Sequence, residues 1–134
     1  MSARWRKRVV QAEGAPTVLA STSAHAVRVG PLLFVTGQTG RKPDGSGYAP
    51  EPAEQARQAL ENVSAIVHAG GSSMRNVVKR TVFVRDAQTY GLMKPVIESY
   101  FPSPVASTTV CGSLLNENAL VEIEVVAVVD DADE

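Results

Sequence analysis

Two carboxylates on one predicted strand are the residues of this sequence whose chemistry is easiest to name. Glu122 and Glu124 alternate with apolar residues in the segment Leu120–Val129. Because side chains along a strand point alternately to its two faces, both glutamates share one face, and the other face is apolar. A carboxylate that such a face partly buries can act as a general base. If the face meets only solvent, the pair is unremarkable, and periodicity alone leaves both interpretations open.

A cluster of small polar side chains precedes this strand. Ser107, Thr108 and Thr109 can bind a neutral polar ligand through their hydroxyls, or they can simply be good strand formers. Cys111 lies two positions beyond Thr109 and shares its face, and we expect a small buried residue there. As a nucleophile it would need a base partner that the sequence does not identify. Because it is the only cysteine, an internal disulfide and a cysteine-based metal cluster are both excluded.

Two helices are predicted to position these residues. The first is Pro52–Ala69, whose apolar residues recur at helical spacing and which Gly70 and Gly71 end. Its opposite face takes the polar residues Gln55, Arg57, Gln58 and Glu61. The second is predicted over Asp86–Phe101, where Pro95 either begins the helix or kinks it.

The remaining elements read as strands that form one sheet. Strands are predicted at Arg4–Gln11, His25–Val29, Leu32–Val35 and Val77–Val84, followed after the second helix by two more, of which Leu120–Val129 is the last. Thr39–Pro52 is rich in Gly and Pro and reads as a loop. The order ββαβαββ, preceded by an edge strand, predicts an α/β sheet with both helices on one face. The face that holds the two glutamates then meets water or another subunit.

The composition limits the classes of function. With 134 residues the chain can form one domain with one core. A net charge of −1 argues against attraction to phosphate, so nucleic acid is not expected as a partner. The basic run 4–8 is interpreted as a solvated edge strand and the acidic segment 130–134 as a frayed tail. No apolar run approaches the roughly 20 residues of a membrane span, and the N-terminus does not resemble a signal peptide, so a cytoplasmic protein is expected.

Four segments resemble the RidA (YjgF / L-PSP) family when they are taken together. They are Gly30–Gln38, Glu54–Asn62, Val77–Asp86 and Leu120–Glu124, which are similar in order and separation to the family's strand-and-turn, first-helix, central-strand and closing-strand motifs. The resemblance covers about residues 20–129 of a single domain, 1–134. It implies a chorismate-mutase-like α+β sandwich, with a mixed sheet and a homotrimeric barrel. It also implies small-molecule pockets between subunits and neither a metal nor an organic cofactor.

The resemblance further implies a reaction. The family's deaminases hydrolyse reactive enamines and imines, such as 2-aminoacrylate, to a 2-keto acid and ammonia. Such chemistry needs a cation for the substrate carboxylate and a carboxylate that places a water against the C=N carbon. Glu122 matches the water-placing glutamate, and its pKa is expected to be raised by partial burial. Thr36 and Gly37 match the motif's Ser-Gly pair and are expected to line the pocket.

The match breaks down at the cation. The family arginine lies in a Pro-Ala-Arg-Ser motif. Counted back from the closing glutamates, the position of this arginine falls at Ser107. Sliding the alignment by one residue gives Ala106 or Thr108, which are not cations either. A pocket tyrosine of the family falls at about Ser23 and an asparagine of the second helix at about Lys94. The pocket therefore differs from the family pattern at three polar positions.

These departures favour an unusual substrate. We expect enamine or imine hydrolysis on a non-standard substrate, with an imine-like or carbonyl compound as the ligand. The alternative is a non-catalytic trimeric binding protein. An endoribonuclease activity, known for some family members, is disfavoured by the charge and by an aromatic content of 5%. Lys94 is the candidate replacement for the missing cation. His25 is placed near the pocket mouth, where it either contacts the ligand or is simply packed.

Overall fold

The computed structural model describes residues 5–129, so Arg4 and the acidic segment 130–134 lie outside the described residues. The elements follow in the order β1 (Lys7–Val10), β2 (Ala26–Val29), β3 (Leu32–Thr39), α1 (Pro52–Ala69), η1 (Met74–Asn76), β4 (Val77–Val84), α2 (Ala87–Ser99), β5 (Ala106–Cys111) and β6 (Val121–Val128). The predicted order is confirmed, and Pro95 lies inside α2. Within the described range, no helix has the length and apolar character that crossing a membrane requires.

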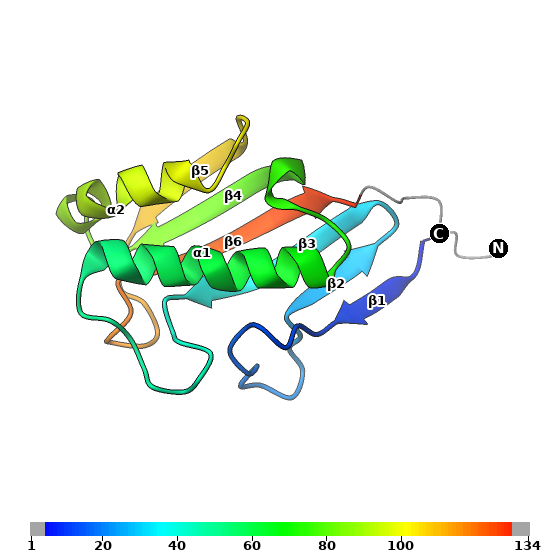
Figure 1. Cartoon of the computed structure of the whole chain (residues 1–134), viewed down its shortest axis with the longest axis horizontal. Helices are drawn as coiled ribbons and strands as arrows, with labels where there is room; N and C mark the ends of the chain where they lie inside the picture. The colour runs from blue at the N-terminus through cyan, green and yellow to red at the C-terminus, as the bar shows by residue number, and fades with distance from the viewer. Residues whose placement is uncertain (1–4, 130–134) are drawn as a thin grey trace.

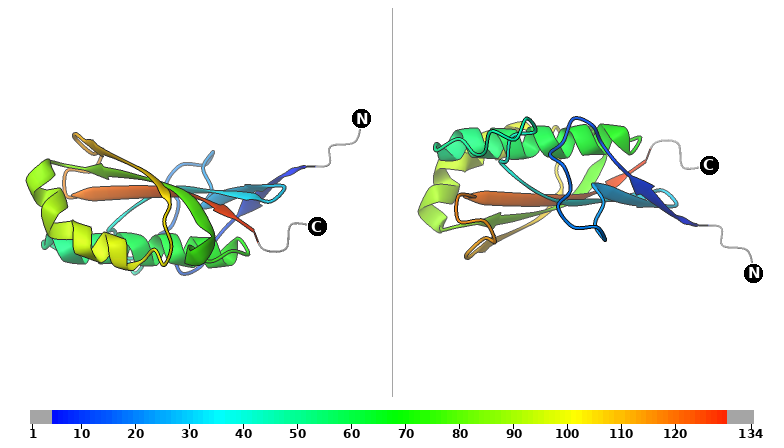
Figure 2. Two further views of the ribbon diagram at one scale, coloured as in Figure 1. Left: turned by 90° about the horizontal axis from the view of Figure 1, so that it is seen from above. Right: turned by 90° about the horizontal axis from the view of Figure 1, so that it is seen from below.

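One mixed sheet organises the molecule (Figure 1). Its six strands lie in the order β1-β2-β3-β6-β4-β5. β4 and β5 run parallel, whereas the other neighbouring pairs run antiparallel. A parallel pair needs a crossover connection, which α2 provides. Both helices cover the same face of the sheet, as predicted (Figure 2).

The core lies between the sheet and the two helices, and α1 contributes most of the helical part. On β6, Val121 and Ile123 are fully buried toward the helices, while Glu122 and Glu124 lie on the other face. The apolar stripe of α1 is buried against this layer at Ala56, Ala59, Leu60, Val63, Ile66 and Val67. Strand alternation and helical periodicity therefore assign both elements to the correct faces.

Gln55 departs from the predicted pattern of α1. It was expected on the polar face, but it is only 2% exposed. Its Nε2 donates to the carbonyls of Ala49 and Asn118 at 2.8 and 2.9 Å, and its Oε1 accepts from the Leu120 amide at 2.8 Å. The buried amide is therefore fully used, and it ties the loops on either side of α1 to the start of β6.

Candidate functional site

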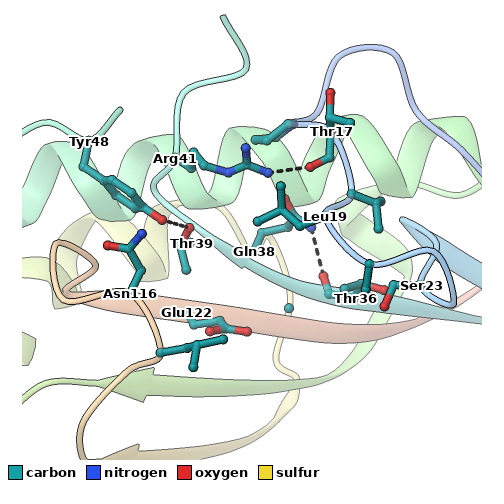
Figure 3. A pocket seen from close by; sticks show the side chains of 15 residues that line it. Thr17, Leu19, Ser23, Thr36, Gln38, Thr39, Arg41, Tyr48, Asn116 and Glu122 are labelled. Carbon is teal, nitrogen blue, oxygen red and sulfur yellow. Dashed lines mark hydrogen bonds between the residues drawn. The ribbon is translucent and has the colours of Figure 1, made fainter. Parts of the chain in front are cut away.

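A pocket opens where the N-terminal loop meets the central strands (Figure 3). Its volume is about 400 Å³. The walls come from the loop 16–23, the end of β3, the loop after it, and the loop after β5. Glu122 of β6 lines the same cavity. The size lies within the range of sites that hold small organic molecules.

A β-bulge shapes one wall of this pocket. The pairing of β3 with β6 shifts register between Val35 and Gln38, so Thr36 and Gly37 stand opposite a single residue of β6. Bulges of this kind redirect side chains and are common beside active sites. The Thr36 hydroxyl donates to the Ala24 carbonyl at 2.5 Å, which fixes its orientation. Thr36 and Gly37 both line the pocket, so the structure places them where the resemblance implies.

Gly37 lies directly against the Glu122 carboxylate. A Cβ atom built at residue 37 would collide with Oε2 of Glu122. A side chain at residue 37 would therefore displace the Glu122 carboxylate from its present position. The carboxylate and the Gly37 backbone therefore form one continuous part of the pocket wall.

Glu122 has the electrostatics of a potential base. Burial raises the pKa of Glu122 above its ordinary value, and the negative charge of Glu124 raises it further. The predicted direction of this pKa shift is confirmed. Within residues 5–129 the carboxylate accepts no hydrogen bond and forms no ion pair, so its oxygens can bind water or ligand. A partly buried carboxylate with a raised pKa is typical of functional sites.

The predicted hydroxyl cluster does not reach this pocket within one chain. Ser107, Thr108 and Thr109 lie on β5, which is an edge strand separated from β6 by β4. Two strand spacings amount to about 10 Å. The Ser107 hydroxyl instead accepts from Nε of Arg80 at 2.9 Å. Because Arg80 is buried against α2, Ser107 faces the helix side of the sheet, away from Glu122.

Lys94 and Cys111 also differ from expectation. Lys94 is exposed on α2, which lies on the helix side of the sheet, so it does not line the pocket of its own chain. Cys111 was expected to be buried but is exposed, because β5 forms the edge of the sheet. Neither side chain can contribute to the Glu122 pocket without a second subunit.

His25 is packed into the fold, which is one of the two alternatives that the sequence left open for it. The side chain is 5% exposed. Its Nδ1 accepts from the Ala12 amide at 2.8 Å, which leaves Nε2 to donate to the Pro16 carbonyl at 2.7 Å. Both ring nitrogens are therefore used in holding the N-terminal loop. Ser23, in that loop, does line the pocket.

Several pocket residues were not predicted from the sequence. They include Gln38, Arg41, Tyr48 and Asn116, which line the cavity together with the predicted residues. Arg41 and Tyr48 belong to the loop 39–52, which has no hydrophobic periodicity that could have indicated their positions. The pairing of Arg41 with Tyr48 in an isolated antiparallel bridge is visible only in the structure.

The family follows from comparison with known proteins. Residues 13–129 match the model of the family described as endoribonuclease L-PSP. The chain belongs to this family, the RidA (YjgF / L-PSP) family. The predicted family and its α+β fold are therefore confirmed, and the match begins somewhat before the expected residue 20.

Individual relatives cover nearly the whole chain. A RutC family protein of Pyrococcus horikoshii is 36% identical over 123 residues, which are 90% of this chain and 97% of that protein. A 2-iminobutanoate/2-iminopropanoate deaminase of Dermatophagoides farinae is 33% identical, over 92% of this chain and 98% of the relative. The crystal structure of a Rid family protein from Yersinia pestis superposes with a TM-score of 0.87 at 30% identity, over 92% of this chain and 100% of the other. This RidA-family chain therefore has imine deaminases among its relatives.

Proposed function

We propose that this RidA-family protein hydrolyses the C=N bond of imines or enamines in the Glu122 pocket. The observation that carries the proposal is a partly buried carboxylate of raised pKa, without a protein partner in the described chain, set against the Gly37 backbone. The similarity to a 2-iminobutanoate/2-iminopropanoate deaminase supports the same reaction class. A binding protein without turnover would have no need for a poised base.

The reaction can be written with Glu122 as the only proton carrier. The carboxylate accepts a proton from water as the water oxygen bonds to the imine carbon, and the C=N bond becomes a C–N single bond. The proton then passes to nitrogen, which gives a carbinolamine. Glu122 next accepts the proton of the carbinolamine hydroxyl and returns it to the nitrogen, so that the C–N bond breaks and ammonia leaves as the C=O bond forms. One imine and one water thus give one carbonyl compound and one ammonia. A raised pKa suits both steps, because the group must accept the proton and then return it.

The substrate is proposed to differ from the smallest 2-imino acids. The stretch 104–110 contains no lysine or arginine, and the resemblance puts the carboxylate-binding arginine of the family within it. Loss of one partner of a buried charge pair costs about 2–5 kcal/mol of recognition. A cation at another position must therefore replace it, or the substrate must be recognised by other groups.

A homotrimer is proposed as the functional form. All of β5 is exposed in the single chain, and the face that carries Glu124 also exposes the apolar side chains of Phe34, Val110 and Val128. Exposed apolar surface of this kind is typical of protein interfaces. Light scattering at micromolar concentration should give the mass of three chains. A monomer mass would contradict the trimer and any pocket that depends on a second subunit.

The catalytic proposal is tested by removing the base. In Glu122→Gln the shape remains but the proton acceptor is lost, so turnover should fall by about 10²–10⁴-fold, with ligand affinity within a few-fold of wild type. Imines are generated in situ by an amino-acid oxidase, and ammonia release is followed. Glu124→Gln is the matched control, because Glu124 is an exposed carboxylate on the same face of the same strand. Because loss of the Glu124 charge also lowers the pKa of Glu122, this variant should keep turnover within a few-fold of wild type, with its pH dependence moved to lower pH.

The outcomes separate the two functions that the sequence left open. An active Glu122→Gln variant would show that Glu122 is only a structural remnant. Ligand binding without turnover in the wild type, across a panel of imines, would contradict hydrolysis and identify the protein as a trimeric binding module.

A further inference from the structure

We infer that Arg41 is the anion-binding group of this pocket, and that the ligand carries its carboxylate apart from the C=N carbon. The inference rests on the proposed function for the position of the C=N carbon beside Glu122. The anion site itself depends only on the surroundings of Arg41. Arg41 is not at the position of the family arginine, and it lies in a loop that the family motifs do not include.

The backbone around Arg41 is fixed from three sides. Nδ2 of the buried Asn62 donates to the carbonyls of Thr39 and Arg41 at 3.1 and 2.9 Å. Arg41 pairs with Tyr48 in the isolated bridge. Gly40 packs so tightly on α1 that a Cβ there would lie 2.6 Å from the Gln55 carbonyl oxygen. Because the backbone that carries this guanidinium is held in place, less entropy is lost when a ligand binds.

The guanidinium of Arg41 has unused binding capacity. Its Nη2 donates to the Thr17 carbonyl at 2.5 Å, across the pocket rim (Figure 3). In residues 5–129 no carboxylate lies within ion-pair distance of it. An arginine has five N–H donors in a planar fork, so a bidentate pair with a ligand carboxylate remains possible. Arg41 is also the only cation among the described residues that line the pocket.

Arg41 and Glu122 line the same cavity but reach it from different segments of the chain. Glu122 is paired in register with Thr39, and Arg41 follows two residues later, about 7 Å further along an extended chain. In Figure 3 the Arg41 side chain points toward Thr17 and away from Glu122, with Gln38 and Leu19 between them. No cation opposes the two causes that raise the pKa of Glu122. A ligand that contacts both groups must therefore span the pocket.

The size and lining of the cavity agree with such a ligand. About 400 Å³ corresponds to roughly a dozen water molecules in the liquid, which is more than a three-carbon imino acid fills. The lining of the cavity includes the apolar side chains of Val18, Leu19 and Leu115. These suit a short aliphatic spacer. The substrate class is therefore an aliphatic imine with a distal carboxylate.

The test compares two ketones of equal length. 4-Oxopentanoate carries a distal carboxylate, and 2-pentanone is its neutral counterpart. Both are titrated at pH 7 into the intact oligomer, and binding is followed by NMR. Wild type should bind 4-oxopentanoate at least about tenfold more tightly than 2-pentanone, and Arg41→Gln should lose this preference, a change of roughly ten- to a hundredfold. Arg41→Lys, which keeps the charge and can still reach Thr17, should retain part of it.

Controls separate charge from loop structure and from catalysis. Lys42→Gln removes the same charge from the neighbouring residue, which does not line the pocket, and should bind like wild type. Equal binding of 4-oxopentanoate by wild type and Arg41→Gln, or no carboxylate preference in wild type, would overturn the inference. Glu122→Gln should keep the preference. If it does while no imine is hydrolysed by wild type, the proposed reaction fails and the anion site stands. If wild type hydrolyses imines but shows no carboxylate preference, the proposed reaction stands and the anion site at Arg41 is overturned.

Discussion

Arg80 and Arg41 differ in burial and in the number of hydrogen-bond partners that the fold gives them. Arg80 of β4 is 8% exposed, donates to Glu98 at 2.7 Å and to Ser107, and lies over the Phe101 ring at 4.7 Å. Among the described residues the Arg41 guanidinium donates only to the Thr17 carbonyl, and it lines a cavity. The first guanidinium has its partners within the fold, whereas the second still has donors for a ligand.

The difference comes from where each residue lies in the sheet. Arg80 points to the helix side of a central strand, where a charge must be paired to be tolerated. Arg41 lies just beyond the end of β3, where the sheet no longer covers it and the pocket begins. Residue type alone therefore does not indicate a binding role. The decisive quantity is the number of donors that the fold leaves unused.

The largest expected effect concerns the standard substrate of the family. Neither arginine is on β5, where the resemblance places the arginine that binds the substrate carboxylate, so we expect 2-aminoacrylate to be hydrolysed poorly. The deficit relative to a deaminase with that arginine should be about 2–5 kcal/mol in kcat/KM, or roughly thirty- to several thousandfold. A serine or threonine dehydratase supplies the enamine, and keto-acid release is followed. Acceleration equal to that by such a relative would show that Lys94 or another cation binds the carboxylate.

A smaller effect should distinguish the two arginines by stability. Arg80→Met removes charge-assisted hydrogen bonds and a cation–π contact, and should lower the free energy of unfolding by about 2–3 kcal/mol. Arg41→Met, the matched variant, loses one exposed hydrogen bond and should lower it by less than about 1 kcal/mol. Urea unfolding of both variants measures the difference. Similar losses would mean that Arg41 is as much a structural residue as Arg80.

The smallest effect is a pH dependence of stability at Glu122. Because the pKa of Glu122 is raised in the folded state, its ionisation disfavours folding, so it lowers stability as pH rises from the unfolded pKa through the folded one. Glu122→Gln removes this penalty. Its Tm should exceed that of wild type at pH 7, and the difference should vanish below the ordinary carboxylate pKa. A lower Tm for Glu122→Gln at pH 7 would mean that the charged form is stabilised by a partner in the assembled protein.

Features set by local periodicity were predictable from the sequence. α1 and β4 have the predicted bounds because their burial patterns depend on a few neighbouring residues. The side on which Glu122 lies follows in the same way from alternation along β6. β3 was predicted too short, since its polar end reads as a turn, whereas the structure shows a bulged strand to Thr39.

Features set by contacts distant in sequence were not predictable. Gln55 is buried because it binds Asn118 and Leu120, more than sixty residues away. His25 is committed to the carbonyl of Pro16 and the amide of Ala12, and Cys111 is exposed because β5 has no outer neighbour. Asn62 of α1 helps to hold the loop that carries Arg41 into the pocket. Each of these depends on tertiary geometry that no spacing in the sequence records.

Turnover of two imines by wild type and Arg41→Gln is the most direct test of the account. Amino-acid oxidases generate the imines of glutamate and alanine in situ, and only the first carries a distal carboxylate. We expect kcat/KM for the glutamate-derived imine to exceed that for the alanine-derived imine by at least about tenfold, and Arg41→Gln to erase the difference. Equal values for the two imines in wild type, or an unchanged preference in Arg41→Gln, would contradict the assignment of substrate recognition to Arg41.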